Sequence, residues 1–310
     1  MTDAAVLSRT AAVYGAPPPA LAAPAAGAVQ VSPLSPGATA LEAIDDGSLE
    51  SLVMLAPPGT VERRYALAQA LRALKVGGRL TALAPKDKGG SRLGKELQAF
   101  GCAVGETARK HHRICVVARP PQPQGLDAAI AEGGPRQLGG LWTQPGVFSW
   151  DRIDPGTALL AETLPSLSGA GADFGCGIGI LGLKVLAAPA VSRLALLDID
   201  RRAVEAAQRN VTDPRADIRW ADVRGAHGAQ AGLADLDFVV MNPPFHDGGA
   251  EDKALGQGFI RAARAALRKG GVLWMVANRH LPYEAVLAEA FAKVTPHADR
   301  GGFKVLEARA

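Results

Sequence analysis

Ala172-Asp173-Phe174-Gly175-Cys176-Gly177-Ile178-Gly179 is the stretch of the 310-residue chain that decides the fold. It is followed by apolar residues at 180, 181, 183, 185 and 186, a spacing typical of a buried helix. Glycine suits a turn between a strand and a helix, because the backbone takes left-handed φ angles there and approaches a ligand with no side chain between. We therefore expect a strand, a glycine turn and a helix, the start of an α/β unit that binds a nucleotide.

A carboxylate, Asp198, ends the next apolar segment, residues 194–198, and Ile199 and Asp200 follow it. Asp200 has the side chain to cap a helix over residues 201–210. Because parallel strands end at the same edge of a sheet, Asp198 should lie beside the glycine turn. A carboxylate about 20 residues beyond the first glycine of such a turn is placed to accept both ribose hydroxyls of a nucleoside.

Two kinds of nucleotide ligand are compatible with this turn. Gly177-x-Gly179-x-x-Gly182 also satisfies the dinucleotide fingerprint of dehydrogenases. S-adenosylmethionine is favoured by Asp173, whose carboxylate suits its cationic amino acid end, and by Asp222 in Trp220-Ala221-Asp222-Val223, which can hold an adenine amino group. Cys176 is interpreted as a small turn residue, because no His or Asn forms a recognisable nucleophile arrangement with it.

An Asn-Pro-Pro-Phe tetrapeptide, residues 242–245, follows the near-continuous apolar run 237–241. Such a run is typical of a central parallel strand that is covered on both faces, and open α/β sheets bind ligands at the carboxyl ends of their strands. Asn242 should therefore face the glycine turn. The two prolines stiffen the backbone that carries its side chain.

This tetrapeptide suits methyl transfer to an exocyclic amine, which is a poor nucleophile because its lone pair is delocalised into an aromatic ring. If the Asn242 amide oxygen and the Pro243 carbonyl each accept one amine hydrogen, the lone pair points at the methyl group. Phe245 offers a face on which a base can stack. The expected catalytic residues are Asn242, Pro243, Pro244 and Phe245. The expected cofactor-binding residues are Asp173, Gly175, Cys176, Gly177, Gly179, Asp198, Ile199, Asp222, Val223 and Asn242.

Residues 52–58 repeat the pattern of residues 238–244, an apolar strand followed by two prolines, and similar helical and strand patterns follow each copy in the same order. We interpret this as a duplicated α/β unit, with domains at 1–140 and 141–310 and a linker at about 120–140. Ala56 replaces Asn242, and residues 1–45 hold no glycine turn, so the first copy is expected to have lost catalysis. The alternative is that strands and helices alternate alike in any α/β protein.

The composition bounds the class of protein. With 48% hydrophobic residues, the chain can bury a substantial core. Its three cysteines show no metal-ligand spacing, so we expect reduced thiols and no metal. No apolar run approaches the roughly 20 residues that a bilayer span needs. Prolines at 17–19 and 24 interrupt the one candidate signal segment, so we expect a cytoplasmic protein.

The formal net charge is +4, and the excess lies in the N-terminal half. Two basic clusters lie there, and each is either a solvated face or a patch that contacts phosphates. Charge alone does not separate these alternatives. The first cluster is Lys86, Lys88, Arg92 and Lys95, and the second is Arg109, Lys110, His111, His112 and Arg113.

The part of the chain from about residue 145 to its end holds several specific motifs. They are Pro145-Gly146-Val147-Phe148-Ser149, Asn242-Pro243-Pro244-Phe245-His246-Asp247-Gly248, Val276-Ala277-Asn278, Leu281-Pro282-Tyr283 and Gly302-Phe303-Lys304-Val305. By these motifs the chain resembles the ribosomal RNA guanine-N2 methyltransferases of the RsmC and RlmG type. The resemblance implies two tandem Rossmann-like class I methyltransferase domains, the N-terminal one degenerate, that methylate a guanine N2 of ribosomal RNA. It implies ribosomal RNA or the small ribosomal subunit as partner, and we expect 16S rRNA as the target. We also expect a monomer, with RNA contacts at Phe245, His246, Lys86, Lys88, Arg92 and Lys95.

Several alternatives stay open at this point. Within the same chemistry they are guanine-N2 methylation of 23S rRNA, methylation of adenine N6 and methylation of a protein glutamine amide. A nicotinamide-dependent dehydrogenase and a non-catalytic RNA-binding scaffold belong to other classes. The dehydrogenase leaves the placement of Asn-Pro-Pro-Phe unexplained, and the scaffold fits the first half of the chain better than the second.

Overall fold

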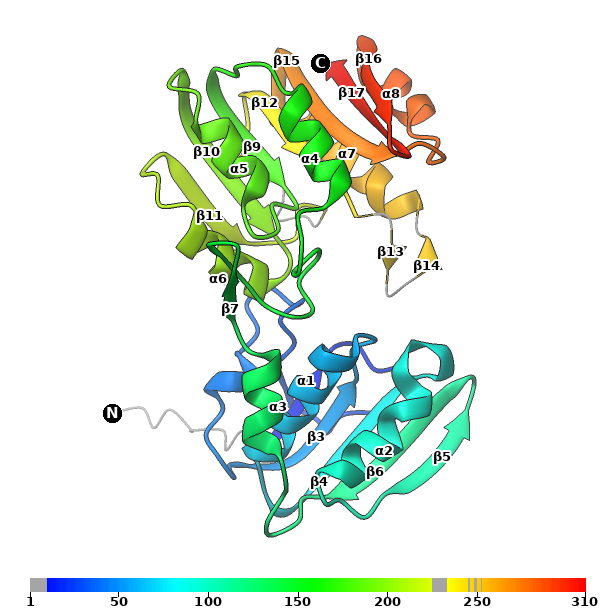
Figure 1. The fold of residues 1–310 in the computed structure, drawn as a ribbon. Coiled ribbons are helices and arrows are strands. Elements are labelled where there is room, and N and C mark those ends of the chain that lie inside the picture. The colour runs from blue at the N-terminus through cyan, green and yellow to red at the C-terminus, as the bar shows by residue number, and fades with distance from the viewer. Residues whose placement is uncertain (1–9, 225–232, 245, 248–249, 252) are drawn as a thin grey trace, which may run out of the picture. The chain divides into compact units, whose positions relative to one another are not determined.

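The computed structural model describes residues 10–224, 233–244, 246–247, 250–251 and 253–310. The chain forms two compact α/β units, Met1–Gly134 and Pro135–Ala310 (Figure 1), which confirms the expected fold class. The first unit ends before the expected boundary at residue 140. Helix α3 (Leu126–Gly133) forms within the segment that was expected to be a linker. This helix belongs to the first unit, because Ala129 is buried in the first core and Leu126 and Ile130 pack against that core. Among the described residues, no helix is long and apolar enough to cross a membrane.

The second unit is a mixed sheet with the strand order β11-β10-β9-β12-β15-β17-β16. The first five strands of this order, β11-β10-β9-β12-β15, run parallel to one another. Strand β17 is antiparallel to both of its neighbours, β15 and β16. The strands are β9 (Gly169–Phe174), β10 (Val191–Asp198), β11 (Ala216–Trp220), β12 (Leu236–Met241), β15 (Leu267–Asn278), β16 (Lys293–Arg300) and β17 (Phe303–Arg309). Two short hairpins are β7 (Arg136–Leu138) with β8 (Leu141–Thr143), and β13 (His246–Asp247) with β14 (Ala250–Glu251).

Helices cover both faces of this sheet. One core contains buried side chains of α7 (Lys253–Ala266) and α8 (Glu284–Ala290), and the other contains those of α4 (Pro155–Thr163) and α5 (Ile180–Leu186) together with α6 (Arg201–Asn210). The central strand β12 is accordingly buried along nearly its whole length, as its apolar run predicts. The carboxyl ends of β9, β10 and β12 therefore meet at one sheet edge between two helical layers.

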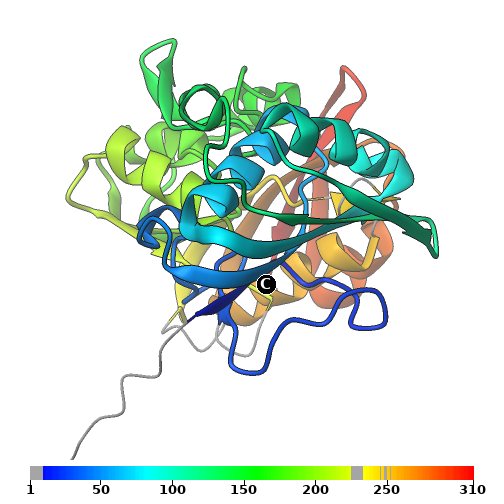
Figure 2. The ribbon, with the colours of Figure 1, turned by 90° about the horizontal axis from the view of Figure 1, so that it is seen from below.

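The first unit has the strand order β2-β1-β3-β4-β6-β5. Helices α1 (Thr60–Ala73) and α2 (Ser91–Ala99) lie on one face of these strands, as Figure 2 shows from below. In β3 (Leu49–Leu55), Leu52 and Met54 are buried, while Val53 between them is only partly buried. The remaining elements are β1 (Ala11–Tyr14), β2 (Val29–Gln30), η1 (Leu41–Ala43), β4 (Leu74–Pro85), η2 (Lys86–Gly90), β5 (Gly105–Arg109) and β6 (His112–Ala118).

The two sheets share one topology. The order β2-β1-β3-β4-β6-β5 matches β10-β9-β12-β15-β17-β16, with the same parallel and antiparallel senses at each step. Ala56 follows β3 as Asn242 follows β12. Generic alternation of strands and helices does not require this agreement, so the topology supports a duplication. Within the described residues, β11 has no counterpart in the first sheet.

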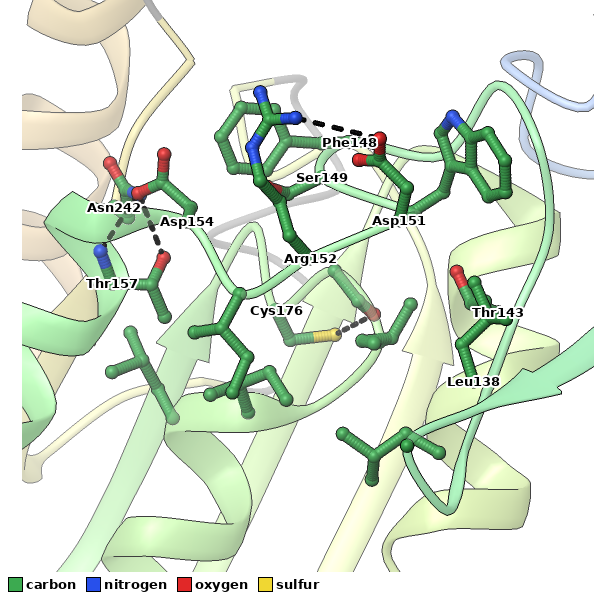
Figure 3. A pocket seen from close by; sticks show the side chains of 18 of the residues that line it. Leu138, Thr143, Phe148, Ser149, Asp151, Arg152, Asp154, Thr157, Cys176 and Asn242 are labelled. Atoms are coloured by element: carbon green, nitrogen blue, oxygen red, sulfur yellow. Dashed lines mark hydrogen bonds and ion pairs between the residues drawn. The ribbon is translucent and has the colours of Figure 1, made fainter.

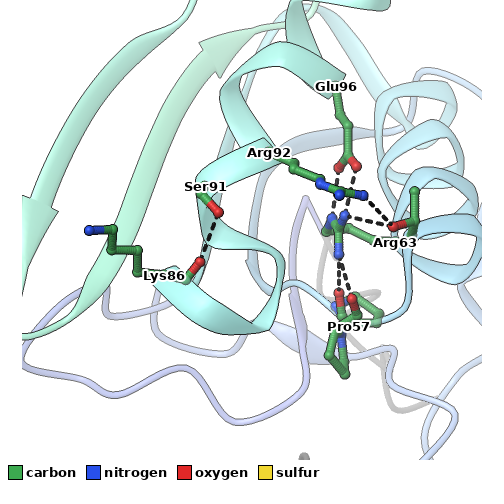
Figure 4. Close-up of polar contacts among 8 residues, drawn as sticks. Pro57, Arg63, Lys86, Ser91, Arg92 and Glu96 are labelled. Carbon is green, nitrogen blue, oxygen red and sulfur yellow. Dashed lines mark hydrogen bonds and ion pairs between the residues drawn. The ribbon is translucent and has the colours of Figure 1, made fainter.

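A buried arginine contacts Ala56-Pro57-Pro58, the segment of the first unit that corresponds to Asn-Pro-Pro (Figure 4). Arg63 of α1 is fully buried and donates to the carbonyls of Pro57 at 3.2 Å and Pro58 at 2.7 Å. Its guanidinium also forms two hydrogen bonds of 2.7 Å with the carboxylate of Glu96. The Pro57 carbonyl, which corresponds to that of Pro243, is thus already hydrogen-bonded within the protein. This is consistent with the loss of catalysis in the first copy, which stays a prediction.

Replacing Arg63 with alanine should destabilise the first unit by about 3–5 kcal/mol, because the carboxylate of Glu96 would remain buried without its cation. Urea unfolding followed by circular dichroism measures the change. Arg64→Ala is the matched control on the same helix, since Arg64 is half-exposed and makes only a 3.5 Å ion pair with Glu132. Its cost should stay below about 1 kcal/mol. Equal effects of the two substitutions would contradict a structural role for the buried pair.

Candidate active site

The turn between β9 and α5 has the conformation that its glycines predict. Gly175, Gly177 and Gly179 have φ angles of +73°, +54° and +94°, which residues with a side chain rarely adopt. A Cβ on Gly179 would lie 2.7 Å from Val211, whereas a Cβ on Gly177 would have no atom within 4 Å. Gly179 thus permits close packing of the turn, and Gly177 leaves open space beside the backbone.

Asp198, at the end of β10, holds the turn in place. One of its carboxylate oxygens accepts from Gly177 N at 2.8 Å, and the other accepts from Asp200 N at 2.8 Å. Burial raises the pKa of the Asp198 carboxyl to about 6. Asp200 caps α6 by accepting from Arg202 N at 3.0 Å, as the sequence predicts. Asp198 therefore lies beside the glycine turn, where a ribose would be accessible to it.

Asp173, near the end of β9, is a buried carboxylate whose oxygens have no hydrogen-bond partner within the described part of the chain. Burial, and then the nearby charge of Asp198, raise the pKa of Asp173 to about 8. A buried carboxylate without a donor is costly unless a ligand supplies one. Burial and the charges of Asp198 and Asp173 also raise the pKa of the Cys176 thiol, which agrees with its interpretation as a turn residue.

The expected adenine contacts lie at the ends of β10 and β11. Ile199 follows Asp198, and its carbonyl accepts from the Trp220 indole at 2.7 Å. Val223 is buried in the core. Asp222 makes two hydrogen bonds of 3.0 Å with the Arg224 guanidinium and does not line the cavity described below. An adenine amino group would have to compete with Arg224 for this carboxylate.

A cavity of about 240 Å³ opens between the glycine turn, the segment 148–157 and Asn242 (Figure 3). Gly175, Cys176 and Gly177 line it on one side. Phe148 and Ile153 also line it, although these residues are 59% and 53% exposed. Exposed apolar groups at the mouth of a cavity suit a flat, partly apolar ligand such as a nucleobase.

Asn242 follows β12 and lies in this cavity, held by two residues of the second unit (Figure 3). Its amide nitrogen donates to the Asp154 carboxylate and to the Thr157 hydroxyl, each at 2.9 Å. Its amide oxygen accepts no hydrogen bond from any residue that the structure describes. Pro243 is buried and Pro244 exposed. Phe245 and the side chain of His246 lie outside the described residues.

Sequence reasoning missed Asp154, Thr157 and Phe148 as residues of this site. Asp154 followed by Pro155 indicates the start of a helix, and the structure confirms that Asp154 caps α4. Phe148 belongs to a motif that carried the family resemblance without a role of its own. The cap pattern could have located α4, but only the fold brings it to Asn242.

The first basic cluster, Lys86, Lys88, Arg92 and Lys95, lies in the first unit and not in the unit that holds the cavity. Lys86, Arg92 and Lys95 are exposed and Lys88 is partly so, on η2 and α2 after the carboxyl end of β4. Lys86 N donates to the carbonyl of His111 at 2.7 Å, in the turn of the β5–β6 hairpin. Lys86 of the first cluster therefore lies beside the hairpin turn that holds His111 of the second cluster.

A Rossmann-like sheet with this glycine turn and an Asn-Pro-Pro segment on the adjacent central strand is the arrangement of class I methyltransferases. A family model described as "Methyltransferase small domain" matches residues 139–307. Ribosomal RNA small subunit methyltransferase C of Pseudomonas entomophila is 31% identical over 274 residues, 86% of this chain and 80% of the relative. The Pseudomonas paraeruginosa protein of that name is 34% identical over 269 residues, 85% and 80% of the two chains. The chain belongs to the ribosomal RNA small subunit methyltransferase C family.

A solved structure agrees with this assignment. The T. thermophilus 16S rRNA N2 methyltransferase RsmC, in complex with AdoMet and guanosine, matches with a TM-score of 0.70 and 28% sequence identity. The match covers 87% of this chain and 75% of that one, so both units take part in it. The resemblance stated from the sequence motifs is confirmed.

Proposed function

We propose that this protein transfers a methyl group from S-adenosylmethionine to the exocyclic N2 amine of a guanine in 16S ribosomal RNA. The observation that carries the proposal is the Asn242 amide oxygen, which has no partner in the described structure and lies in a cavity shared with the glycine turn. The family assignment supports the same reaction, because the T. thermophilus relative was solved with a methyl donor and a guanine nucleoside together.

The residues around the glycine turn fit S-adenosylmethionine. Asp173 offers a buried carboxylate without a donor to the cationic amino group, and Asp198 lies beside the turn to accept ribose hydroxyls. Gly177 leaves open space where the ligand meets the backbone. Ile199, Asp222 and Val223 are the proposed adenine contacts. When bound, the cofactor supplies an electrophilic methyl group.

The chemistry of the protein's own groups follows from the weakness of the guanine amine as a nucleophile. Asn242 Oδ1 and the Pro243 carbonyl would each accept one amine hydrogen, which turns the lone pair out of conjugation with the ring. Holding the reacting atoms about 3–3.5 Å apart then supplies much of the acceleration. No strong base is needed, because an amine proton becomes acidic only as the N–C bond forms and can then leave to water or a neighbouring acceptor. The bond between the methyl carbon and sulfur breaks in the same step, with S-adenosylhomocysteine as the leaving group.

Reaching this site requires the base to leave its stack. An unpaired or flipped nucleotide costs a few kcal/mol to present, and stacking on an aromatic ring returns about 1–3 kcal/mol. The exposed ring of Phe148 at the cavity mouth can provide such a face, together with Phe245, the residue proposed from the sequence. We propose both as contacts of the substrate base.

The first unit is proposed to contact RNA phosphates through its two basic clusters, which meet at Lys86 and His111. Lys86 and Lys95 are exposed, and Arg109 and Lys110 project from the neighbouring hairpin. Such a surface attracts the RNA backbone without regard to its sequence. The catalytic unit would then select the base, and the first unit would contribute affinity.

Replacing Lys86 and Lys95 with glutamine should weaken binding to 16S rRNA and flatten its dependence on salt. Each lost phosphate contact should lower the slope of log Kd against log salt concentration by about 0.7. Filter binding between 50 and 200 mM salt measures this. The matched control replaces Lys269 and Lys293, two exposed lysines of the second unit, and should leave the slope unchanged. Equal slopes for all three proteins would contradict the phosphate contact.

The proposed function is tested by labelled methyl transfer to 16S rRNA, 23S rRNA and small subunits, with mass analysis of the nucleosides and of the proteins. N2-methylguanosine is the expected product. N6-methyladenine, a methylated glutamine or modification of 23S rRNA alone would each replace the proposal with one of the alternatives. Calorimetry should show binding of S-adenosylmethionine and none of NADH; the reverse would favour a dehydrogenase.

A further inference from the structure

We infer that Asp154, acting with Thr157, is a positioning residue that orients the side-chain amide of Asn242 for the reaction. The inference rests on the proposed function, since it assigns how the proposed acceptor is held. It adds to the site two residues that lie 88 and 85 positions away from Asn242 in the chain.

The orientation follows from what each group can donate or accept. An ionised carboxylate only accepts hydrogen bonds, and an asparagine amide carries both a donor nitrogen and an acceptor oxygen. Asp154 Oδ2 lies 2.9 Å from Asn242 Nδ2, and the Thr157 hydroxyl lies 2.9 Å from the same atom. Rotating the amide by 180° would bring its oxygen against the carboxylate, with no hydrogen to share. The amide oxygen is therefore directed away from Asp154 and left available to a substrate.

The same contact should strengthen that oxygen as an acceptor. A hydrogen bond from an amide N–H to a carboxylate is charge-assisted, and hydrogen bonds in series polarise one another. Electron density moves from the amide nitrogen toward its oxygen when the N–H groups are engaged. Asn242 Oδ1 then accepts an amine hydrogen better than a free asparagine side chain would.

Asp154 is itself held rigidly at the first turn of α4. The oxygen that contacts Asn242 also accepts from Thr157 N at 2.8 Å, which is the capping hydrogen bond of the helix. Gly156 keeps space for this arrangement, because a Cβ there would lie 2.9 Å from the Phe303 ring and 3.0 Å from Asp154 Oδ2. The carboxylate is thus fixed before any substrate binds, as precise positioning requires.

Capping and positioning predict different outcomes for the same substitutions. Serine caps helices about as well as aspartate, but its shorter side chain does not carry an oxygen to Asn242. Asp154→Ser should therefore keep the melting temperature nearly unchanged. Methyl transfer should nevertheless slow, with kcat lower by about 10²-fold, because a misplaced group costs that much. The Kd for S-adenosylmethionine should stay within about 3-fold, since the loss falls on the reacting geometry.

Thr157 gives an independent and smaller test. Thr157→Val removes the hydroxyl acceptor with little change in shape and should lower kcat, whereas Thr157→Ser keeps the acceptor and should restore it. Thr163→Val is the matched control, since the Thr163 hydroxyl on the same helix donates to the carbonyl of Leu159 at 2.7 Å and does not contact Asn242. It should leave kcat unchanged.

A spectroscopic readout separates this inference from the proposed function. The side-chain NH₂ resonances of Asn242, assigned by their loss in Asn242→Ala, should move in Asp154→Ser and Thr157→Val and stay in place in Thr163→Val. Unmoved resonances, or full kcat in Asp154→Ser beside an inactive Asn242→Ala, would overturn the positioning role. A wild-type protein that transfers no methyl group to guanine would instead overturn the proposed function, while the resonances still report whether Asp154 orients the amide.

Discussion

Asn242→Ala is expected to lower kcat for guanine methylation by about 10²- to 10³-fold, the usual cost of removing one hydrogen-bonding group that acts on developing charge. The alanine removes the amide oxygen, so an amine hydrogen loses its acceptor and the lone pair returns toward conjugation. The backbone conformation around residue 242 should stay unchanged in this variant, because β12 is buried on both sides and Pro243 and Pro244 keep the segment stiff. The loss should therefore appear in kcat.

Binding of the cofactor gives the internal control for this variant. The glycine turn, Asp173 and Asp198 are untouched, so the Kd for S-adenosylmethionine should change by less than about 3-fold. Labelled methyl transfer to small subunits measures kcat, and calorimetry measures Kd. Undiminished activity in Asn242→Ala would show that the amide oxygen is not the acceptor. A large loss of cofactor affinity would show that Asn242 acts on the cofactor rather than on the base.

Asp173→Asn is expected to raise the stability of the ligand-free protein and to lower its affinity for S-adenosylmethionine. The wild-type carboxylate is buried without a donor in the described structure, so its neutral replacement should stabilise the ligand-free protein by about 1–3 kcal/mol near pH 8. The same substitution removes the anion proposed to meet the cationic amino group. The affinity for S-adenosylmethionine should fall by about 10²-fold, as for a lost charged hydrogen bond of about 3 kcal/mol.

The pH dependence has a definite sign. The pKa of Asp173 rises from 3.8 to about 8 on folding, so the folded protein holds this proton more tightly than the unfolded chain does. Its contribution to stability is therefore present below about pH 4 and is lost as the pH rises toward 8. Binding of a cation needs the ionised carboxylate, so the affinity for S-adenosylmethionine should rise between pH 6 and pH 8 with release of a proton.

Thermal unfolding at pH 5.5 and 8.5, with and without S-adenosylmethionine, measures the pH dependence of stability. Calorimetry in two buffers of different ionisation enthalpy measures the cofactor affinity and the proton released on binding. Asp173→Asn should lose this part of the pH dependence. Asp217→Asn is the control, because Asp217 is an exposed carboxylate paired with Arg219 on β11, and its effect should be below about 1 kcal/mol. Wild-type stability that does not fall as the pH rises would contradict the raised pKa of Asp173.

Patterns that are local in the chain predicted the elements well. The helix capped by Asp200 spans residues 201–210 as expected, and the glycine turn joins a strand to a helix. The run before Asn242 is a central parallel strand. These features follow from backbone conformation, capping and hydrophobic periodicity, and each of these acts over a few residues. The duplication was also visible, because equal patterns recur in equal order.

Contacts between distant segments were not predictable in the same way. Helix α3 lies in a segment whose Pro, Gly and Gln content indicated a linker, because a few apolar side chains suffice to pack it on the first core. The packing of α3 depends on core residues far along the chain, which no local pattern identifies.

By itself, the sequence determined the α/β class, the repeated unit, the glycine turn and the position of Asn242 after a buried strand, since spacing and polarity carry that information. Only the tertiary structure decided how the Asn242 amide is turned. That orientation depends on Asp154 and Thr157, which the packing of α4 brings within 2.9 Å across more than 80 residues of chain. The direction of these hydrogen bonds depends on which donor and acceptor atoms face each other, and only the folded chain brings Asp154 and Thr157 to Asn242.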